Sequence, residues 1–153
     1  MSPVPSPVVV VGRGVAGMAT ALAAAPAHVV LLCRETVPAG SASMLAQGGI
    51  AAAIGAGDSA AAHAADTLEA GAHHNDPAAV EWLCESAPAT VVWLQAQGVA
   101  FDRAPDGTLQ LGREGGHGAA RIVHAGGDAS GAAVVRALRA RTDAAGHVEL
   151  RGG

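Results

Sequence analysis

The sequence predicts an α/β fold: a Rossmann-like domain with a parallel sheet and flanking helices, incomplete at its C-terminal end. The β-branched run Val8–Val11 is followed at once by a glycine turn at 12–17, and a second apolar run lies at 28–33. The segment 148–150 has the composition of one more strand. Strand, turn, helix and strand in this order form a βαβ unit, whose crossover is almost always right-handed.

The first strand is expected to be buried on both faces, because Val8–Val11 is continuously apolar rather than alternating. A helix is expected over Met18–Ala25, which is rich in good helix formers and closed by Pro26. The second strand is expected over His28–Cys33.

The turn between them has the spacing Gly12-x-Gly14-x-x-Gly17, the dinucleotide-binding fingerprint in its required context. Gly12 would allow the tight turn, Gly14 a close approach to a pyrophosphate, and Gly17 close packing of helix on strand. The helix N-terminus would supply N–H donors and a partial positive charge for the phosphates. The alternative is a turn that only packs the helix on the strand.

The second strand ends in Arg34 and Glu35. Glu35 is placed to accept a ribose hydroxyl, or Arg34 to lie beside an adenosine and its phosphates. A solvated charge pair at the end of a strand is the alternative for either residue.

The segment 36–57 is rich in small residues and lacks periodicity, so we expect a binding loop rather than a passive connector. A helix is expected over Ser59–Ala70, ended by Gly71.

Another helix should begin after Asp76, a good N-cap followed by Pro77, and end near Gly98. Pro88 should kink that helix or divide it in two. A turn at 104–108 is expected to join two short strands.

The third main helix is expected to follow Asp128 and run to about Arg141, before the strand at 148–150.

Composition excludes several function classes. A net charge of −4 argues against nucleic acid as a main partner. Cys33 and Cys84 lie far apart without metal-ligand spacing, and His73-His74 is expected to sit in solvent, so no metal site is predicted. The longest apolar runs are strand-sized and no signal peptide is evident, so we expect a soluble cytoplasmic protein without a membrane partner.

Several segments resemble one flavoprotein superfamily. The run 43–52, with Ala-Gln-Gly-Gly at 46–49, is similar to the second flavin-binding segment of succinate dehydrogenases, fumarate reductases and L-aspartate oxidases. The match continues at 63–71 and 93–101. Arg113-Glu114-Gly115-Gly116-His117, together with 121–131, resembles L-aspartate oxidases rather than the dicarboxylate dehydrogenases. The resemblance extends over residues 8 to 151.

The resemblance implies a bound FAD. Ala42 stands where membrane succinate dehydrogenases carry the histidine that bonds to the flavin, so a non-covalent FAD is expected. The predicted cofactor-binding residues are Gly12, Arg13, Gly14, Val15, Ala16, Gly17, Arg34, Ala42, Ser43, Met44, Leu45, Ala46, Gln47, Gly48 and Gly49.

The resemblance also implies an activity: FAD-dependent oxidation of L-aspartate to iminoaspartate, with oxygen or fumarate as the final acceptor. This is the first step of de novo NAD biosynthesis, and quinolinate synthase uses the product. The alternatives are a soluble fumarate reductase-like or succinate dehydrogenase-like flavoprotein, and a non-catalytic nucleotide-binding remnant.

Glu114 is the predicted catalytic residue, orienting the substrate through its α-ammonium group; a carboxylate there favours aspartate over succinate, which has no cation. The alternative is a loop charge in solvent. His117 is predicted to bind substrate, and His124 flanks the same loop and could also reach a substrate carboxylate, although both could instead bond to loop carbonyls. Arg121 could clamp a carboxylate, but fixing the loop to Asp128 is favoured. Gly118 stands where the family usually has serine.

By this resemblance, residues 1–153 correspond to the N-terminal part of an FAD-binding domain. The capping domain, which carries the family's catalytic arginine, and the C-terminal helical domain would be absent. The chain alone is therefore expected to hold FAD poorly and not to turn over aspartate.

Overall fold

The computed structural model describes residues 6–34 and 41–152. The chain divides into two compact units, one formed by residues 1–46 with 131–153 and the other by residues 47–130. The fold confirms the α/β class, since each unit combines helices with a three-stranded sheet, and the sheet of the first is parallel.

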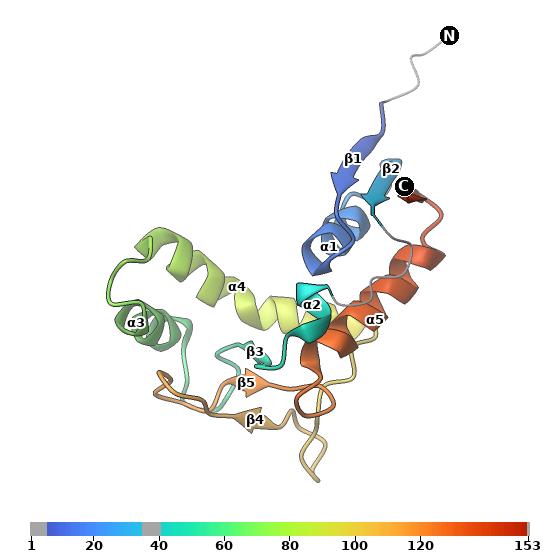
Figure 1. Cartoon of the computed structure of the whole chain (residues 1–153). Helices are drawn as coiled ribbons and strands as arrows, with labels where there is room; N and C mark the ends of the chain where they lie inside the picture. Colours follow the sequence, from blue (N-terminus) through green and yellow to red (C-terminus); the bar gives the residue numbers. More distant parts are fainter. Residues whose placement is uncertain (1–5, 35–40, 153) are drawn as a thin grey trace. The chain divides into compact units, whose positions relative to one another are not determined.

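The first unit contains a parallel sheet in the order β1-β2-β6, with β1 at Val8–Val11, β2 at Val29–Cys33 and β6 at Val148–Gly152 (Figure 1). Val29 pairs with Val8 on one side and with Val148 on the other. The predicted βαβ unit and the final strand are therefore confirmed. The sheet places the carboxyl end of β1, where the glycine turn begins, beside that of β2.

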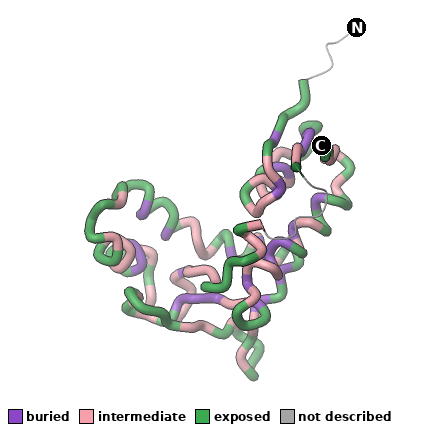
Figure 2. The backbone as a smooth tube through the Cα atoms, viewed as in Figure 1, coloured by how far each residue is buried: buried purple, intermediate pink, exposed green. Residues whose placement is uncertain are grey.

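Burial differs between the strands. Val29, Val30 and Leu31 of β2 are buried, as expected for a central strand. In β1 only Val10 is buried, while Val9 and Val11 are 57% and 80% exposed, and Figure 2 shows most of this strand as exposed. The prediction that β1 is buried on both faces is wrong. Among the described residues β1 is an edge strand, with β2 its only neighbour.

Three helices accompany this sheet: α1 (Val15–Ala23), α2 (Ala42–Leu45) and α5 (Ser130–Ala144). The helix α1 begins three residues earlier than the predicted Met18, because the turn residues Val15 and Ala16 already belong to its first turn. It also ends two residues before the predicted Ala25, ahead of Pro26.

The second unit contains α3 (Ala60–Ala70), α4 (Pro77–Ala96) and a small antiparallel sheet. The sheet has the order β3-β5-β4, from Ile50–Ala51, Ile122–Val123 and Leu111–Gly112 (Figure 1). The binding loop expected over 36–57 contains the short elements α2 and β3, and its binding role stays a prediction; residues 35–40 lie outside the described residues. The predicted turn at 104–108 is flanked by a single bridge between Arg103 and Leu109 rather than by two strands.

Two side-chain caps confirm the predicted helix starts in this unit. The Ser59 hydroxyl accepts from the Ala62 amide at 3.1 Å, and one Asp76 carboxylate oxygen accepts from the Ala78 and Ala79 amides at 2.9 and 3.2 Å. Cap side chains satisfy amides that have no acceptor inside the helix. Both helices therefore start where their caps predict.

Pro88 lies inside α4, but the helix continues from Pro77 to Ala96, so Pro88 does not divide it in two, and the alternative of a kink stays a prediction. A proline removes one backbone hydrogen bond. Packing on both sides of Pro88 offsets this loss: Val80 and Cys84 form a buried cluster with Ala64 of α3, and Val91 and Leu94 are also buried. Within the described residues, no helix is both long and apolar enough to cross a membrane.

Asp76→Ala should lower the free energy of unfolding by about 1 kcal/mol, because it removes the acceptor for two amides at the start of α4. Chemical denaturation followed by circular dichroism measures this change. Asp76→Asn should preserve most of the stability, and Glu81→Ala, an exposed position on the same helix, should change it little. An Asp76→Ala variant as stable as Glu81→Ala would contradict the capping role.

Candidate functional site

The glycine turn after β1 has the geometry of a phosphate-binding turn. Gly12 adopts a φ of +103°, which side chains rarely tolerate. A Cβ on Gly17 would lie 1.9 Å from the Gly12 carbonyl oxygen, so glycine is required where α1 crosses the turn. The roles predicted for Gly12 and Gly17 are confirmed. The role of Gly14 toward a pyrophosphate stays a prediction; Gly14 is the N-cap residue of α1.

The first turn of α1 offers amide donors. The first intrahelical bond runs from the Met18 amide to the Gly14 carbonyl at 3.0 Å. The amides of Ala16 and Gly17 therefore have no acceptor within the helix, and a phosphate could accept hydrogen bonds from them. This arrangement fits the pyrophosphate of a dinucleotide such as FAD.

The second predicted cofactor segment packs directly on this turn. The Ser43 hydroxyl accepts from the Val15 amide at 3.3 Å, and a Cβ on Gly14 would lie 3.3 Å from the same oxygen. Ser41 caps α2 by accepting from the Met44 amide. Two predicted cofactor segments, separated by some thirty positions in the sequence, thus meet at the N-terminus of α1.

Gly131 has a role that the sequence analysis missed. A Cβ there would lie 2.1 Å from the Ser43 carbonyl oxygen and 2.7 Å from that of Ala46, and its amide donates to Ala46 at 2.9 Å. Glycine at this position lets α5 pack against α2. The sequence feature that could have indicated this role is the position of Gly131 at the end of the run 121–131.

Arg13 and Arg34 have different surroundings. The Arg13 side chain is buried and forms an ion pair with Asp143 of α5, a partner that sequence reasoning missed. Arg34 is exposed just beyond β2. The prediction for Glu35 lies outside the described residues.

The remaining cofactor residues, Gln47, Gly48 and Gly49, belong to the second unit. Gly49 adopts a φ of +73°, and a Cβ there would lie 2.6 Å from Ile122 and from the Val123 carbonyl oxygen. This glycine is therefore required for the close approach of the chain to β5. A Cβ on Gly48 would lie 3.9 Å from Glu114 Oε2, so the Glu114 carboxylate lies next to Gly48.

Glu114 and His117 lie in the loop 113–120, which joins β4 to β5; we call it the substrate loop, after the substrate role that the sequence predicts for these two residues. The strands β4 and β5 pair as Leu111 with Val123 and Gly112 with Ile122. The Glu114 side chain is 50% exposed and lies 4.0 Å from His124 Nε2. The predicted Glu114 and His124 are thus brought together beside Gly48.

Arg121, at the end of this loop, is 1% exposed and pairs with two carboxylates. Its Nε and Nη2 donate to Asp58 at 2.9 and 2.8 Å, and its Nη1 donates to Asp66 at 2.6 Å. The prediction that Arg121 fixes the loop to Asp128 is wrong. The two acceptors lie 63 and 55 positions away in the sequence, so tertiary packing brings them to the guanidinium. Asp128, the partner expected from the sequence, is exposed instead.

Hydrogen bonds shift the pKa values of this cluster. Hydrogen bonds from Arg121 lower the pKa of Asp58, and the Gly118 amide, then Arg121, lowers that of Asp66. Hydrogen bonds to the same carboxylates raise the pKa of Arg121. Burial, then the nearby Arg121 and His117, lowers the pKa of His63, whose ring centroid lies 5.7 Å from that of His117. The cluster therefore holds its carboxylates ionised.

Asp102 holds the loop that follows β5. Asp102 accepts from the amides of Gly126 and Gly127 at 2.9 and 3.0 Å; both glycines have positive φ. These bonds, that of Gly127 first, lower the pKa of Asp102. A polar pocket of about 220 Å³ lies here, lined by Asp102, Gln110, Gly112, His124, Gly127 and Asp128.

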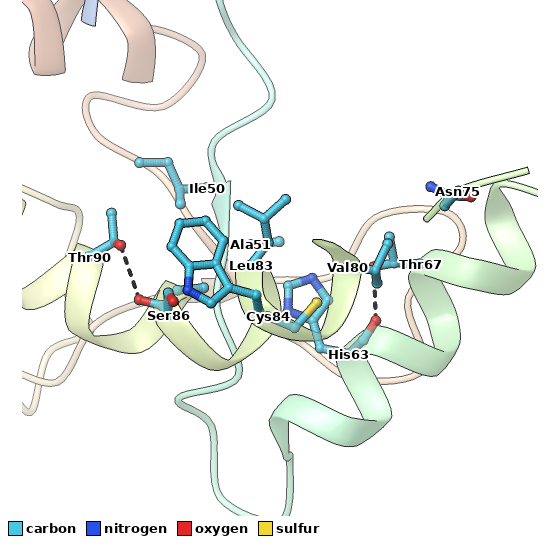
Figure 3. A pocket seen from close by; sticks show the side chains of 12 residues that line it. Ile50, Ala51, His63, Thr67, Asn75, Val80, Leu83, Cys84, Ser86 and Thr90 are labelled. Carbon is cyan, nitrogen blue, oxygen red and sulfur yellow. Dashed lines mark hydrogen bonds between the residues drawn. The ribbon is translucent and has the colours of Figure 1, made fainter. Parts of the chain in front are cut away.

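A larger, mainly apolar pocket of about 450 Å³ lies among α3, α4 and β3. Figure 3 shows His63 and Cys84 among the side chains that line this pocket. Thr67 donates to the His63 carbonyl at 2.9 Å and Thr90 to the Ser86 carbonyl at 3.0 Å. Each hydroxyl is therefore bonded to a backbone carbonyl of its own helix.

The described part of the chain contains no group of three or more His, Cys, Asp or Glu side chains that could hold a metal ion. His73 and His74 are exposed; His73 pairs with Glu69 at 3.2 Å, and His74 bonds to the Ala72 carbonyl at 3.0 Å.

This chain is similar to several known proteins. The chain is 48% identical over 130 residues to the L-aspartate oxidase of Mesorhizobium japonicum, covering 85% of this chain and 25% of the relative. It is 48% identical over 149 residues to the L-aspartate oxidase of Mycobacterium tuberculosis, covering 95% and 28%. The chain thus spans about a quarter of the length of these curated relatives.

Among solved structures, a quinol fumarate reductase of E. coli superposes with a TM-score of 0.87 at 25% identity, covering 98% of this chain and 26% of that chain. Residues 7–151 match the family described as FAD binding domain. This match extends over almost the whole chain. The chain therefore belongs to the FAD binding domain family, and FAD is its cofactor.

Proposed function

We propose that this chain is the FAD-binding part of an L-aspartate oxidase, which oxidises L-aspartate to iminoaspartate with oxygen or fumarate as final acceptor. The observation that supports this most is the position of Glu114, half-exposed beside Gly48 of the flavin segment. The relatives named L-aspartate oxidase support it independently.

Residues of this chain would hold the cofactor in two places. The amides of the first α1 turn would bind the pyrophosphate, and the segment 42–49 would lie along the flavin. Ala42 has no nucleophilic atom, so the cofactor would be held without a covalent bond. When bound, FAD supplies the hydride acceptor for oxidation at the substrate Cα.

Glu114 would orient the substrate. Its carboxylate can pair with the α-ammonium group of aspartate, a charge-assisted contact that succinate cannot make. It would therefore favour aspartate and disfavour a dicarboxylate without a cation. His117, three positions further along the substrate loop, would donate to a substrate carboxylate. The arginine base that the aspartate oxidase resemblance implies belongs to a capping domain outside residues 1–153.

In the cell, this activity would form the first step of de novo NAD biosynthesis in the cytoplasm. Its imine product would be used by quinolinate synthase.

A soluble fumarate reductase is the second candidate, favoured by the likeness to the solved quinol fumarate reductase. Fumarate has no ammonium group, so Glu114 would have no role in its binding. Turnover of the native protein with aspartate and with fumarate, each measured separately, distinguishes the two candidates. No turnover of either, with FAD bound, would leave a non-catalytic nucleotide-binding module.

Glu114→Gln should lower kcat/KM for aspartate oxidation roughly 10- to 100-fold, since a hydrogen bond to a charged group contributes about 1.5–3 kcal/mol. Fumarate reduction by the same variant should change little. Hydrogen peroxide release and fumarate-dependent reoxidation measure the two reactions. Glu81→Gln, an exposed carboxylate on α4, is the matched control. Equal losses in both reactions would refute the ammonium-pairing role.

A further inference from the structure

The substrate loop is attached to α3 at one backbone position. The Gly118 amide donates to Asp66 Oδ2 at 2.6 Å, and the same oxygen accepts from Arg121 Nη1 at 2.6 Å. Asp66 therefore links a loop amide and a buried cation across 52 and 55 positions of sequence.

Arg121 is a rigid anchor for this link. Its amide donates to the Gly112 carbonyl at 3.0 Å, and its carbonyl accepts from the Ala52 amide at 2.9 Å. The backbone of Arg121 is thus fixed to both neighbouring strands, while its guanidinium is buried between carboxylates. The Asp66 side chain, bonded to Arg121, is therefore connected to the small antiparallel sheet.

His117 is oriented by the same groups. Its carbonyl accepts from Arg113 Nε at 2.8 Å, and its Nδ1 lies 3.4 Å from Arg121 Nη1. A guanidinium only donates, so Nδ1 acts as the acceptor, and the proton of the neutral ring lies on Nε2. The ring therefore presents an N–H donor on its Nε2 side.

The two carboxylates around Arg121 differ in what else they contact. Asp58, 2% exposed, accepts from Arg121 and from the Ser59 amide next to it. Asp66, 27% exposed, also accepts from the substrate loop. The more exposed carboxylate is thus the one that joins the loop to the cluster.

We propose that Asp66, acting through Gly118 and Arg121, is a positioning residue that fixes the substrate loop and aims His117 Nε2–H at a substrate carboxylate. This inference rests on the proposed function for the role of the loop, and extends it to a residue of α3.

The test compares Asp66→Asn with Asp58→Asn in the native holoprotein, because each substitution removes one of the two negative charges that pair with the Arg121 guanidinium. Asp66→Asn should speed amide hydrogen exchange across 113–120 and lower kcat/KM roughly 10- to 100-fold, as expected for a loosened binding group. Aspartate oxidation and fumarate reduction should fall together, since both ligands carry carboxylates. Asp58→Asn should lower the melting temperature at least as much, with loop exchange and kcat/KM near the wild-type values.

Gly118→Pro provides a second variant, because it removes the loop N–H and keeps all three charged side chains, while its Cβ would lie 3.2 Å from Asp66 Oδ2. It should reproduce the exchange and kcat/KM changes of Asp66→Asn. Activity losses that follow melting temperature in all three variants, or unchanged loop exchange in Asp66→Asn, would overturn the proposal. A wild-type protein that fails to oxidise aspartate would refute the proposed function, while loop exchange would still decide whether Asp66 holds the loop.

Discussion

Gly17→Ala is expected to abolish FAD binding and to lower the free energy of unfolding by about 3 kcal/mol, the upper part of the usual range for overpacking. The added Cβ would lie 1.9 Å from the Gly12 carbonyl oxygen and 3.5 Å from Val10 Cγ1. Either α1 must move away from the turn or the turn must deform. Both responses displace the amides that would bind the pyrophosphate.

Flavin absorbance of the purified native protein and its thermal denaturation measure this effect. Gly146→Ala is the matched control, since a Cβ there has no atom within 4 Å and Gly146 belongs to the same unit. A Gly17→Ala variant that retains FAD and has the same melting temperature as the Gly146→Ala variant would show that the turn tolerates a side chain.

Arg121→Met is expected to lower the free energy of unfolding by about 3–5 kcal/mol at pH 7, the usual result of removing one partner of a buried ion pair. The substitution preserves much of the aliphatic volume but leaves the buried Asp58 carboxylate without its guanidinium. Arg103→Met, at an exposed position, should change stability little.

The pH dependence identifies the cause of this loss. In the wild type the pKa values of Asp58 and Asp66 are lowered, so their ionisation stabilises the fold above the unfolded value near 3.9. That stability is lost as pH falls through the folded values. Without Arg121, protonation of Asp58 removes the penalty of a buried charge.

The difference in unfolding free energy between wild type and Arg121→Met should therefore be large at pH 7 and shrink below about pH 4. Urea denaturation at a series of pH values measures it. A difference that stays constant with pH would indicate lost packing rather than lost charge pairing.

Local signals were predictive where neighbouring residues decide the backbone. Asp76 and Ser59 mark helix starts because a cap satisfies amides two or three positions away. The same signals fail where burial decides. Pro88 predicts a break, yet buried contacts on both sides preserve α4.

The candidate site divides in the same way. The glycine turn agrees with the motif from which it was predicted, whereas the position of Glu114 beside Gly48 was found only in the structure. The partners of Arg121 could not be read from its own segment. Asp58 and Asp66 lie in another part of the chain, and the sequence around Arg121 favours Asp128, which is only seven positions away.

The sequence by itself determined the βαβ order and the glycine turn, because these depend on spacing within short segments, and its motifs resemble those of the family. Only the tertiary structure decided which carboxylates neutralise Arg121, and that Asp66 is the one that also binds the substrate loop. The physical reason is that a buried cation must be paired by whichever anions the packing of α3 and the small sheet brings to it. That choice is made in space, across more than fifty positions of chain.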